Sequence, residues 1–179
     1  PRNFAKVSIP SGTTTIVMDP HEIGNVYGVE GVKYMHDSGE GLPQRQFVDI
    51  PSCVPAVPGC ENAGAEFFAK EIEELAELKR VIGLAEVMDY IGVINQEDRM
   101  ADIIHAAERK GLYLQGHAPF VSGRDLSAYL IGGPVTDHES RTGEEAIEKL
   151  RSGMFIDSRE SSITHNVKDI WEGVKHCKF

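Results

Sequence analysis

The sequence predicts an α/β protein built as part of a (β/α)8 barrel, with about six β/α units in one domain over residues 1–179. Two observations carry this prediction. Short apolar segments alternate with segments of helical periodicity, which is the pattern of a parallel sheet with crossover helices. Three consecutive apolar segments also end in a glutamate or a histidine, and polar residues at the C-terminal ends of neighbouring barrel strands converge on one site.

Six short segments are strand candidates because they are rich in β-branched and apolar residues. In chain order they are Gly12–Asp19, Gln46–Pro51, Val81–Val87, Leu112–Ala118, Gly133–Glu139 and Met154–Glu160. Their apolar character is nearly continuous, as expected of strands that are covered on both faces. A closed eightfold barrel takes typically ~250 residues, so a chain of 179 residues predicts a partial barrel.

Helical periodicity fills several of the gaps between these strands. The predicted helices are Ala65–Lys79, Glu97–Lys110, a helix between Thr142 and Gly153, and Thr164–Lys175. In the first of them, Phe68, Ile72 and Leu75 fall on one apolar stripe. The third helix opens with a capping box, in which Thr142 precedes Glu145 by three positions.

An open doubly wound sheet is the alternative architecture, because six strands are enough to complete one. Such folds commonly carry a glycine-rich phosphate loop after the first strand, and neither G-x-G-x-x-G nor a Walker-type loop occurs in this sequence. The polar residues at three consecutive strand ends instead favour the barrel.

Composition excludes two classes of partner. The chain has 28 acidic and 18 basic residues and a net charge of −10, whereas nucleic acids and anionic membranes require clustered Lys and Arg. The sequence contains no apolar run of ~20 residues and does not open with a signal-peptide pattern. Cys53, Cys60 and Cys177 form an odd set without a C-x-x-C pair. This favours free thiols in a reducing cytoplasm.

Glu86, His117 and His138 are the strongest candidates for metal ligands. They stand at the ends of the segments VIGLAEV, LYLQGHA and VTDHE. Imidazole and carboxylate groups suit Mn, Fe or Zn. A single Glu or His at a strand end is more often a surface residue or a helix cap, but three in register favour a shared site.

Other polar residues near these strand ends have two interpretations. His21 and Glu22, in the sequence Asp-Pro-His-Glu, either line the pocket or belong to a helix start that Asp19 caps. Asp137 and Glu139 flank His138, and one of them is a candidate to orient its ring. Cys53 follows the second strand candidate and is either a residue of the site rim or a buried thiol.

The chain closely resembles the bacterial and archaeal adenine deaminases of the amidohydrolase superfamily. The resemblance lies in PSGTTTIVMDPHEIGNV, PSCVPA, GLAEVM, GHAPFVSGRDLSAY and TDHESRTGEEAIEKLRSGM, at residues 10–26, 51–56, 83–88, 116–129 and 136–154. Single pieces such as GHAP carry little weight. Their order and spacing along nearly the whole chain make the resemblance specific.

The resemblance implies that the chain is a central fragment of a longer enzyme. Members of this family carry an H-x-H pair on the first barrel strand and an aspartate on the eighth, and this sequence has neither. The chain is therefore expected to span strands two to seven, with strands one and eight missing. The first residue, Pro1, in place of Met agrees with this expectation. A fragment without those ligands is expected to be inactive.

The resemblance also assigns roles to individual residues. Glu86 matches the strand-four glutamate that bridges two divalent metals, and His117 and His138 match the ligands on strands five and six. His21 and Glu22 belong to a stretch that lines the substrate or metal pocket. The implied reaction is hydrolytic deamination of adenine to hypoxanthine and ammonia in purine salvage. Manganese or iron, with zinc as the alternative, would supply a strong nucleophile by lowering the pKa of bound water from about 15.7 toward ~7.

Two alternatives remain open at this point. The chain could belong to another amidohydrolase that acts on a different amine or cyclic amide. It could instead be a metal-binding or assembly module without turnover. A homo-oligomer is expected, because the outermost strands of an incomplete sheet, TTTIVMD and MFIDS, are apolar and open to pairing. The alternative is that the terminal segments Pro1–Ser11 and Ser161–Phe179 cap these edges within one chain.

Overall fold

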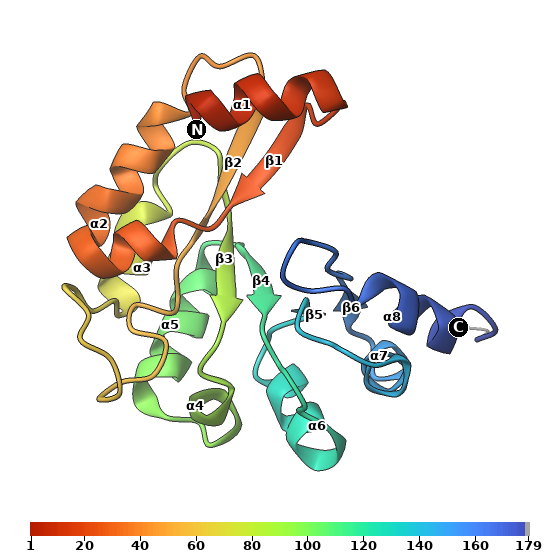
Figure 1. Ribbon diagram of the computed structural model, residues 1–179. Helices are drawn as coiled ribbons and strands as arrows, with labels where there is room; N and C mark the ends of the chain where they lie inside the picture. The colour runs from red at the N-terminus through yellow and green to blue at the C-terminus, as the bar shows by residue number, and fades with distance from the viewer. Residues whose placement is uncertain (178–179) are drawn as a thin grey trace.

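The computed structural model describes residues 1–177 as a curled parallel sheet with helices on its outer face (Figure 1). The strands are β1 (Thr15–Met18), β2 (Arg45–Ile50), β3 (Val81–Val87), β4 (Tyr113–Gly116), β5 (Thr136–Asp137) and β6 (Phe155–Ile156). The helices are α1 (Arg2–Ser8), the short 3-10 turn Ile9–Ser11, α2 (His21–Ser38), α3 (Ala69–Leu75), α4 (Tyr90–Ile94), α5 (Asp98–Arg109), α6 (Gly123–Ile131), α7 (Gly143–Arg151) and α8 (Val167–Val174). The last two residues of the predicted domain lie outside the described residues.

The strands form two parallel ladders rather than one. Four strands pair in the order β1-β2-β3-β4, and β5 pairs separately with β6. The ladder stops at β4 because Gly116 N–H donates to the hydroxyl of Thr136 at 2.9 Å instead of to a backbone carbonyl. The N–H of Val135 still reaches the carbonyl of Leu114 at 3.2 Å, so β5 runs beside β4. The α/β class and the parallel half-barrel sheet are confirmed. Strands β1, β4, β5 and β6 are shorter than the predicted segments that contain them, β3 has its predicted bounds, and β2 begins one residue before its predicted start.

The hydrophobic core lies between the sheet and the outer helices. Leu84 of β3 and Ile50 of β2 meet Ile72 of α3 and Met100 and Ile103 of α5, and all five are at most 1% exposed. Burying a side chain of this size contributes roughly 1.5–3 kcal/mol. The core therefore fixes strands β2 and β3, whose C-terminal ends carry polar residues.

Helix α2 was not predicted, because its sequence has no regular apolar stripe and contains Gly24, Gly28 and Gly31. The helix begins directly after Pro20, without a side-chain cap, so Asp19 does not have the capping role that was one of its two interpretations. It bends at Gly28, whose φ of 61° and ψ of −147° are open to glycine. A Cβ at Gly31 would lie 2.7 Å from the carbonyl oxygen of Ile23, so the bend brings the backbone too close for any side chain there.

Helix α3 begins at Ala69 and not at Ala65, so its predicted start is wrong by one turn. The N–H of Phe67 donates to the carbonyl of Val54 at 2.7 Å, which keeps this stretch extended. As a result Phe67 is buried at 1% exposure while Phe68, the predicted stripe residue, is 46% exposed. Glu71 then caps the helix by accepting the N–H of Phe68 at 2.9 Å.

The candidate ligands lie at only one end of the sheet. Residues at or just after the ends of β1, β3, β4 and β5 meet at the C-terminal end, where the arrowheads of Figure 1 point. At the opposite end the chain returns through short turns, such as residues 39–44 between α2 and β2. In that turn Gly41 is exposed and has a φ of 68°. The candidate ligands are therefore all carried by one rim.

Candidate metal centre

A carboxylate and two imidazoles meet at the C-terminal ends of β3, β4 and β5. Glu86 is the last but one residue of β3, while His117 and His138 directly follow β4 and β5. The Nδ1 atom of His117 lies 2.7 Å from Oε2 of Glu86, and Nε2 of His138 lies 2.8 Å from the same oxygen. The two imidazole rings are 5.3 Å apart and nearly perpendicular, at 74°. The structure therefore brings together the three residues that the sequence indicated.

Burial and hydrogen bonding act in opposite directions on Glu86. Removal from water raises the pKa of its carboxyl group, but hydrogen bonds with His117 and His138 outweigh burial and lower the pKa well below its usual range. The hydrogen bond with Glu86 in turn raises the pKa of His138. Glu86 is therefore an anion at neutral pH, the form in which a carboxylate binds a cation.

Two hydroxyl groups fix the backbone around these ligands. Tyr129 of α6 is fully buried, donates to the carbonyl of Val87 at 2.8 Å and accepts the N–H of His117 at 2.9 Å. The hydroxyl of Ser52 donates to the carbonyl of Glu86 at 2.8 Å. Sequence reasoning missed both residues, because a tyrosine in a helix and a serine in a loop have no signal of their own.

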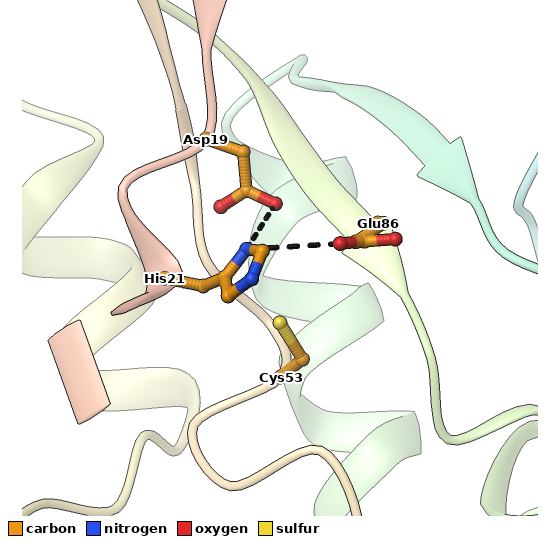
Figure 2. Close-up of side chains that lie close together, drawn as sticks. All are labelled: Asp19, His21, Cys53 and Glu86. Atoms are coloured by element: carbon orange, nitrogen blue, oxygen red, sulfur yellow. Dashed lines mark hydrogen bonds and ion pairs between the residues drawn. The ribbon is translucent and has the colours of Figure 1, made fainter. Parts of the chain in front are cut away.

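A second group of polar side chains lies on the other side of Glu86 (Figure 2). Nδ1 of His21 is 2.9 Å from Oδ2 of Asp19 and 3.6 Å from Oε1 of Glu86. Cys53 is buried at 2% exposure and faces the same ring. The hydrogen bond that the His21 ring makes to the carboxylate of Asp19, followed by its contact with Cys53, raises the pKa of His21 to about 11. His21 thus opens helix α2 and lies beside Glu86 as well.

Glu22 does not join this group closely. Its side chain is 81% exposed, and its Oε1 lies 3.7 Å from Nε2 of His21. At this distance the contact is an ion pair at the surface of the site. The structure thus places His21 among the residues that line a cavity and Glu22 on the exposed surface beside it.

Asp137 and Glu139 differ in their surroundings. Asp137 is fully buried and accepts the N–H of Ala118 at 2.8 Å and the ammonium of Lys149 at 2.9 Å. Lys149 is fully buried as well and also donates to the carbonyl of Ala118 at 2.6 Å. Glu139 lies 3.7 Å from Nε2 of His138 and pairs with Arg159. Of the two acids, Glu139 contacts the ring of His138, and Asp137 supports the loop after β4.

A cavity of about 300 Å³ opens on the inner face of the sheet beside these ligands. Asp49, Glu86, Gln115 and His138 are among the residues that line it. Its volume is at the lower limit of small-molecule sites. Oδ1 of Asp49 is buried and has no hydrogen-bond partner within residues 1–177, and burial raises the pKa of this carboxyl to about 6.

The donor atoms fit a divalent transition-metal ion. One atom each from Glu86, His117 and His138 lie within 4.8 Å of one another, and so do those of Asp19, His21, Cys53 and Glu86. Nitrogen donors mixed with carboxylate suit Mn, Fe and Zn, whereas Ca and Mg prefer oxygen ligands alone. The chemistry of the site therefore agrees with the metals expected from the sequence, without choosing among them.

Comparisons with known proteins identify relatives of the chain. The amidohydrolase family matches residues 1–177. An adenine deaminase from Serratia proteamaculans is 45% identical over 90% of this chain, which corresponds to 27% of that protein. Adenine deaminases from Staphylothermus marinus and Clostridium acetobutylicum are 44% and 42% identical over 98% and 97% of the chain, or 30% of each protein. The chain thus spans less than a third of the length of these relatives.

Fold and site together define an α/β half-barrel with metal-type ligands on its C-terminal rim. Within residues 1–177 none of the helices is long and apolar enough to cross a membrane. Because the family match covers nearly all residues, the chain belongs to the amidohydrolase family.

Proposed function

We propose that the chain forms part of a metal-dependent adenine deaminase, which hydrolyses adenine to hypoxanthine and ammonia in purine salvage. One observation carries the proposal: Glu86 is held between His117 and His138 at 2.7 and 2.8 Å, inside a chain whose relatives carry the name adenine deaminase. The cavity of about 300 Å³ beside Glu86 is at the lower limit of small-molecule sites.

The residues of the chain have separable roles in this proposal. Glu86, His117 and His138 would hold a divalent cation, with Glu86 as the shared ligand of a second one. Bound Mn or Fe, with Zn as the alternative, would supply Lewis-acid chemistry that activates water for hydrolysis. His21 lines the same pocket, and the exposed Glu22 stands beside it as a candidate substrate contact. Glu139 lies 3.7 Å from Nε2 of His138, and Asp137 holds the loop that carries His117.

The proposal also covers the place of the chain in the barrel, its assembly, its partners and its location. The six strands correspond to strands two to seven of an eightfold barrel, and residues 1–179 form a single catalytic region within it. Exposed apolar side chains on the strands, such as Val17 at 49% and Phe155 at 64% exposure, support association into a homo-oligomer. The net charge of −10 disfavours nucleic acid and anionic membrane as partners. The unpaired thiols Cys53 and Cys60 support a cytoplasmic location.

The test is adenine turnover by the full-length protein that carries this chain, followed through the ultraviolet change from adenine to hypoxanthine with Mn or Fe present. Glu86→Gln is expected to lower kcat/KM by more than about 100-fold, because even the outer partners of metal ligands are worth 10–100-fold. The matched control is Glu77→Gln, whose side chain is 71% exposed and pairs with Lys110.

The outcomes separate the alternatives. The 179 residues alone are expected to show no turnover, because they offer Glu86 and two histidines in place of the family's full ligand set. Near-normal activity of Glu86→Gln contradicts the bridging role. Ammonia release from another amine, with adenine left intact, identifies a different amidohydrolase. Metal binding without any turnover identifies a binding module.

A further inference from the structure

The cavity beside Glu86 contains a polar pair that the metal centre does not use. Asp49 of β2 and Gln115 of β4 both line this cavity of about 300 Å³. Asp49 stands opposite Gly83 in the ladder between β2 and β3, three positions before Glu86, and Gln115 precedes His117 by two. At about 3.3 Å per residue along a strand, the pair lies deeper in the sheet than the candidate ligands.

A glycine makes room for the carboxylate of Asp49. Strand β3 lies between β2 and β4 (Figure 1), so the side chains of Asp49 and Gln115 meet over β3. A Cβ at Gly83 would lie 2.5 Å from Oδ1 of Asp49 and 2.8 Å from its Cγ. Any other residue at this position would displace the carboxylate. The bare backbone of Gly83 therefore allows an acid and an amide from two strands to come together.

Hydrogen bonds fix the direction of the Gln115 amide. Its Oε1 accepts the hydroxyl of Thr136 at 2.9 Å, and that hydroxyl accepts the N–H of Gly116 at 2.9 Å. The amide nitrogen is therefore the end that faces Asp49, whose Oδ2 lies 3.4 Å away. An amide nitrogen has two N–H donors. Within residues 1–177 this bond uses one of them, and the second is available to a ligand.

Asp49 supplies a free acceptor beside that donor. The residue is 4% exposed, and its Oδ1 has no hydrogen-bond partner among the described residues. Buried acceptors are almost always paired, so an unpaired one points to a missing donor. The 3.4 Å bond from Gln115 is longer than the usual range of about 2.7–3.2 Å, and the last torsion of an aspartate is soft. The carboxylate can therefore turn toward a better donor on a ligand.

We propose that Asp49 and Gln115 recognise the edge of a free purine base on which the N–H of the five-membered ring lies beside a nitrogen of the six-membered ring. Asp49 accepts the N–H, and Gln115 donates to the neighbouring nitrogen. The inference rests on the proposed deamination, in which the amino-bearing carbon faces the metal ligands and this edge points away from them. A nucleoside carries a sugar in place of that hydrogen, so the pair selects free bases over nucleosides.

Calorimetric binding of hypoxanthine to the full-length, metal-loaded protein at about pH 8 tests the proposal. Hypoxanthine has the same edge as adenine and, as the proposed product, is not consumed. Asp49 is ionised under these conditions, because burial raises its pKa only to about 6. The wild type is expected to bind hypoxanthine at least about 10-fold more tightly than 9-methylhypoxanthine, since a site built around a hydrogen bond rejects a ligand that cannot form it.

Asp49→Asn is the matched variant. The N–H of Gln115 would attract the carbonyl of the new amide, so that its NH₂ group takes the place of the free acceptor and opposes the N–H of the base. Hypoxanthine affinity is expected to fall by about 10-fold or more, and the preference over 9-methylhypoxanthine should disappear. Gln115→Leu should instead remove the preference for hypoxanthine over 3-deazahypoxanthine. Asp157→Asn, at an exposed position, should change neither preference.

The wild-type comparison remains decisive if a variant does not fold. Equal affinity of the wild type for hypoxanthine and 9-methylhypoxanthine, or an unchanged preference in Asp49→Asn, overturns the proposal. Adenine turnover is assayed separately. Turnover by the wild type with an unchanged preference in Asp49→Asn overturns this inference and leaves the proposed function intact. Binding that depends on Asp49 in a protein without turnover supports the inference and contradicts the proposed reaction.

Discussion

At the scale of single residues, Lys149 has the least usual surroundings. Its ammonium is fully buried and donates to Asp137 at 2.9 Å, Glu145 at 2.7 Å and the carbonyl of Ala118 at 2.6 Å. Breaking a buried pair leaves an uncompensated charge and typically costs 3–5 kcal/mol. Lys149 therefore contributes to the position of the loop after β4 as well as to stability.

Lys149→Met is expected to lower the free energy of unfolding by about 3–5 kcal/mol, measured by urea denaturation at pH 7. Hydrogen bonding by Ser140 and the charge of Lys149 outweigh burial and lower the pKa of Asp137. A depressed pKa gives stability that is present at neutral pH and lost only as the pH falls through the folded-state pKa. Lys70→Met is the control at an exposed position. Equal stabilities for the two variants would contradict the prediction.

The raised pKa of Asp49 predicts a pH dependence of stability opposite to that of Asp137, because here stability falls as the pH rises. Burial raises the pKa of this carboxyl to about 6, above the ordinary value of about 3.9. The folded state therefore holds the proton more tightly, and the stability that this group contributes at acid pH declines as the pH rises through about 6. Asp49→Asn has no such decline, so its advantage over the wild type grows with pH.

We expect Asp49→Asn to be more stable than the metal-free wild type by roughly 1–3 kcal/mol at pH 8, and by about half as much at pH 5. Denaturation curves at the two pH values measure this difference. Asp157→Asn, at an exposed position, serves as the control and should show little change. An advantage that is the same at both pH values would rule out titration of Asp49 as its cause.

At the scale of elements, one arginine fastens the long segment between β2 and α3 to helix α5. The guanidinium of Arg99 donates to the carbonyls of Phe67 at 3.2 Å, Ser52 at 3.3 Å and Val54 at 3.0 Å. These contacts lie on both sides of the loop that carries Cys53. Arg99 is therefore a positioning residue for that loop.

Arg99→Met is expected to cost about 1.5–3 kcal/mol of stability, the range for hydrogen bonds to a charged group. Amide hydrogen exchange in residues 52–67 should become faster, and alkylation of the buried Cys53 should follow it. Mass spectrometry measures both rates, with Arg124→Met as the control at an exposed position. If exchange rises equally throughout the chain, Arg99 supports global stability and has no local role.

The sequence predicts an element well where one periodicity dominates. All six strands were located from continuous apolar runs, and Thr142 accepts the N–H of Glu145 at 3.2 Å, as its capping box predicted. Helix α2 was missed because its glycines serve a bend that only packing against neighbours explains. The start of α3 was misplaced because the bond from Phe67 to Val54 is a tertiary contact.

Site residues, too, could be predicted where a local sequence pattern marks them and not where tertiary contacts decide their role. Glu86, His117 and His138 could be found because each stands at the end of an apolar run, and parallel strands bring such ends together. Lys149 and Tyr129 could not be found, because their partners lie in other elements. Asp137 and Glu139 also could not be told apart from the sequence. Asp137 pairs with Lys149 and Glu139 lies near His138, and this difference depends on side-chain geometry.

At the scale of the whole molecule, the sheet is a half-barrel in which the regular backbone ladder is interrupted between β4 and β5. The hydroxyl of Thr136 takes the place of a ladder acceptor for Gly116 and also donates to Gln115 at 2.9 Å. A Cβ at Gly116 would lie 2.0 Å from the carbonyl of Thr136. The close approach holds β5 and its histidine beside β4 without a regular ladder, and the sequence pattern gives no sign of it.

The division of the molecule into two rims has a practical consequence. Every candidate ligand lies at or just beyond the C-terminal end of a strand, whereas the turn over residues 39–44 lies at the far end of the sheet and contributes none of them. Exposed loop tips rich in small residues accept insertions and chemical labels with little cost. Gly41, exposed in that turn, is therefore a natural attachment point for a dye, an electrode or a solid support. A protein immobilised there would present the rim of its candidate ligands to the solution, as a biosensor for metal ions requires.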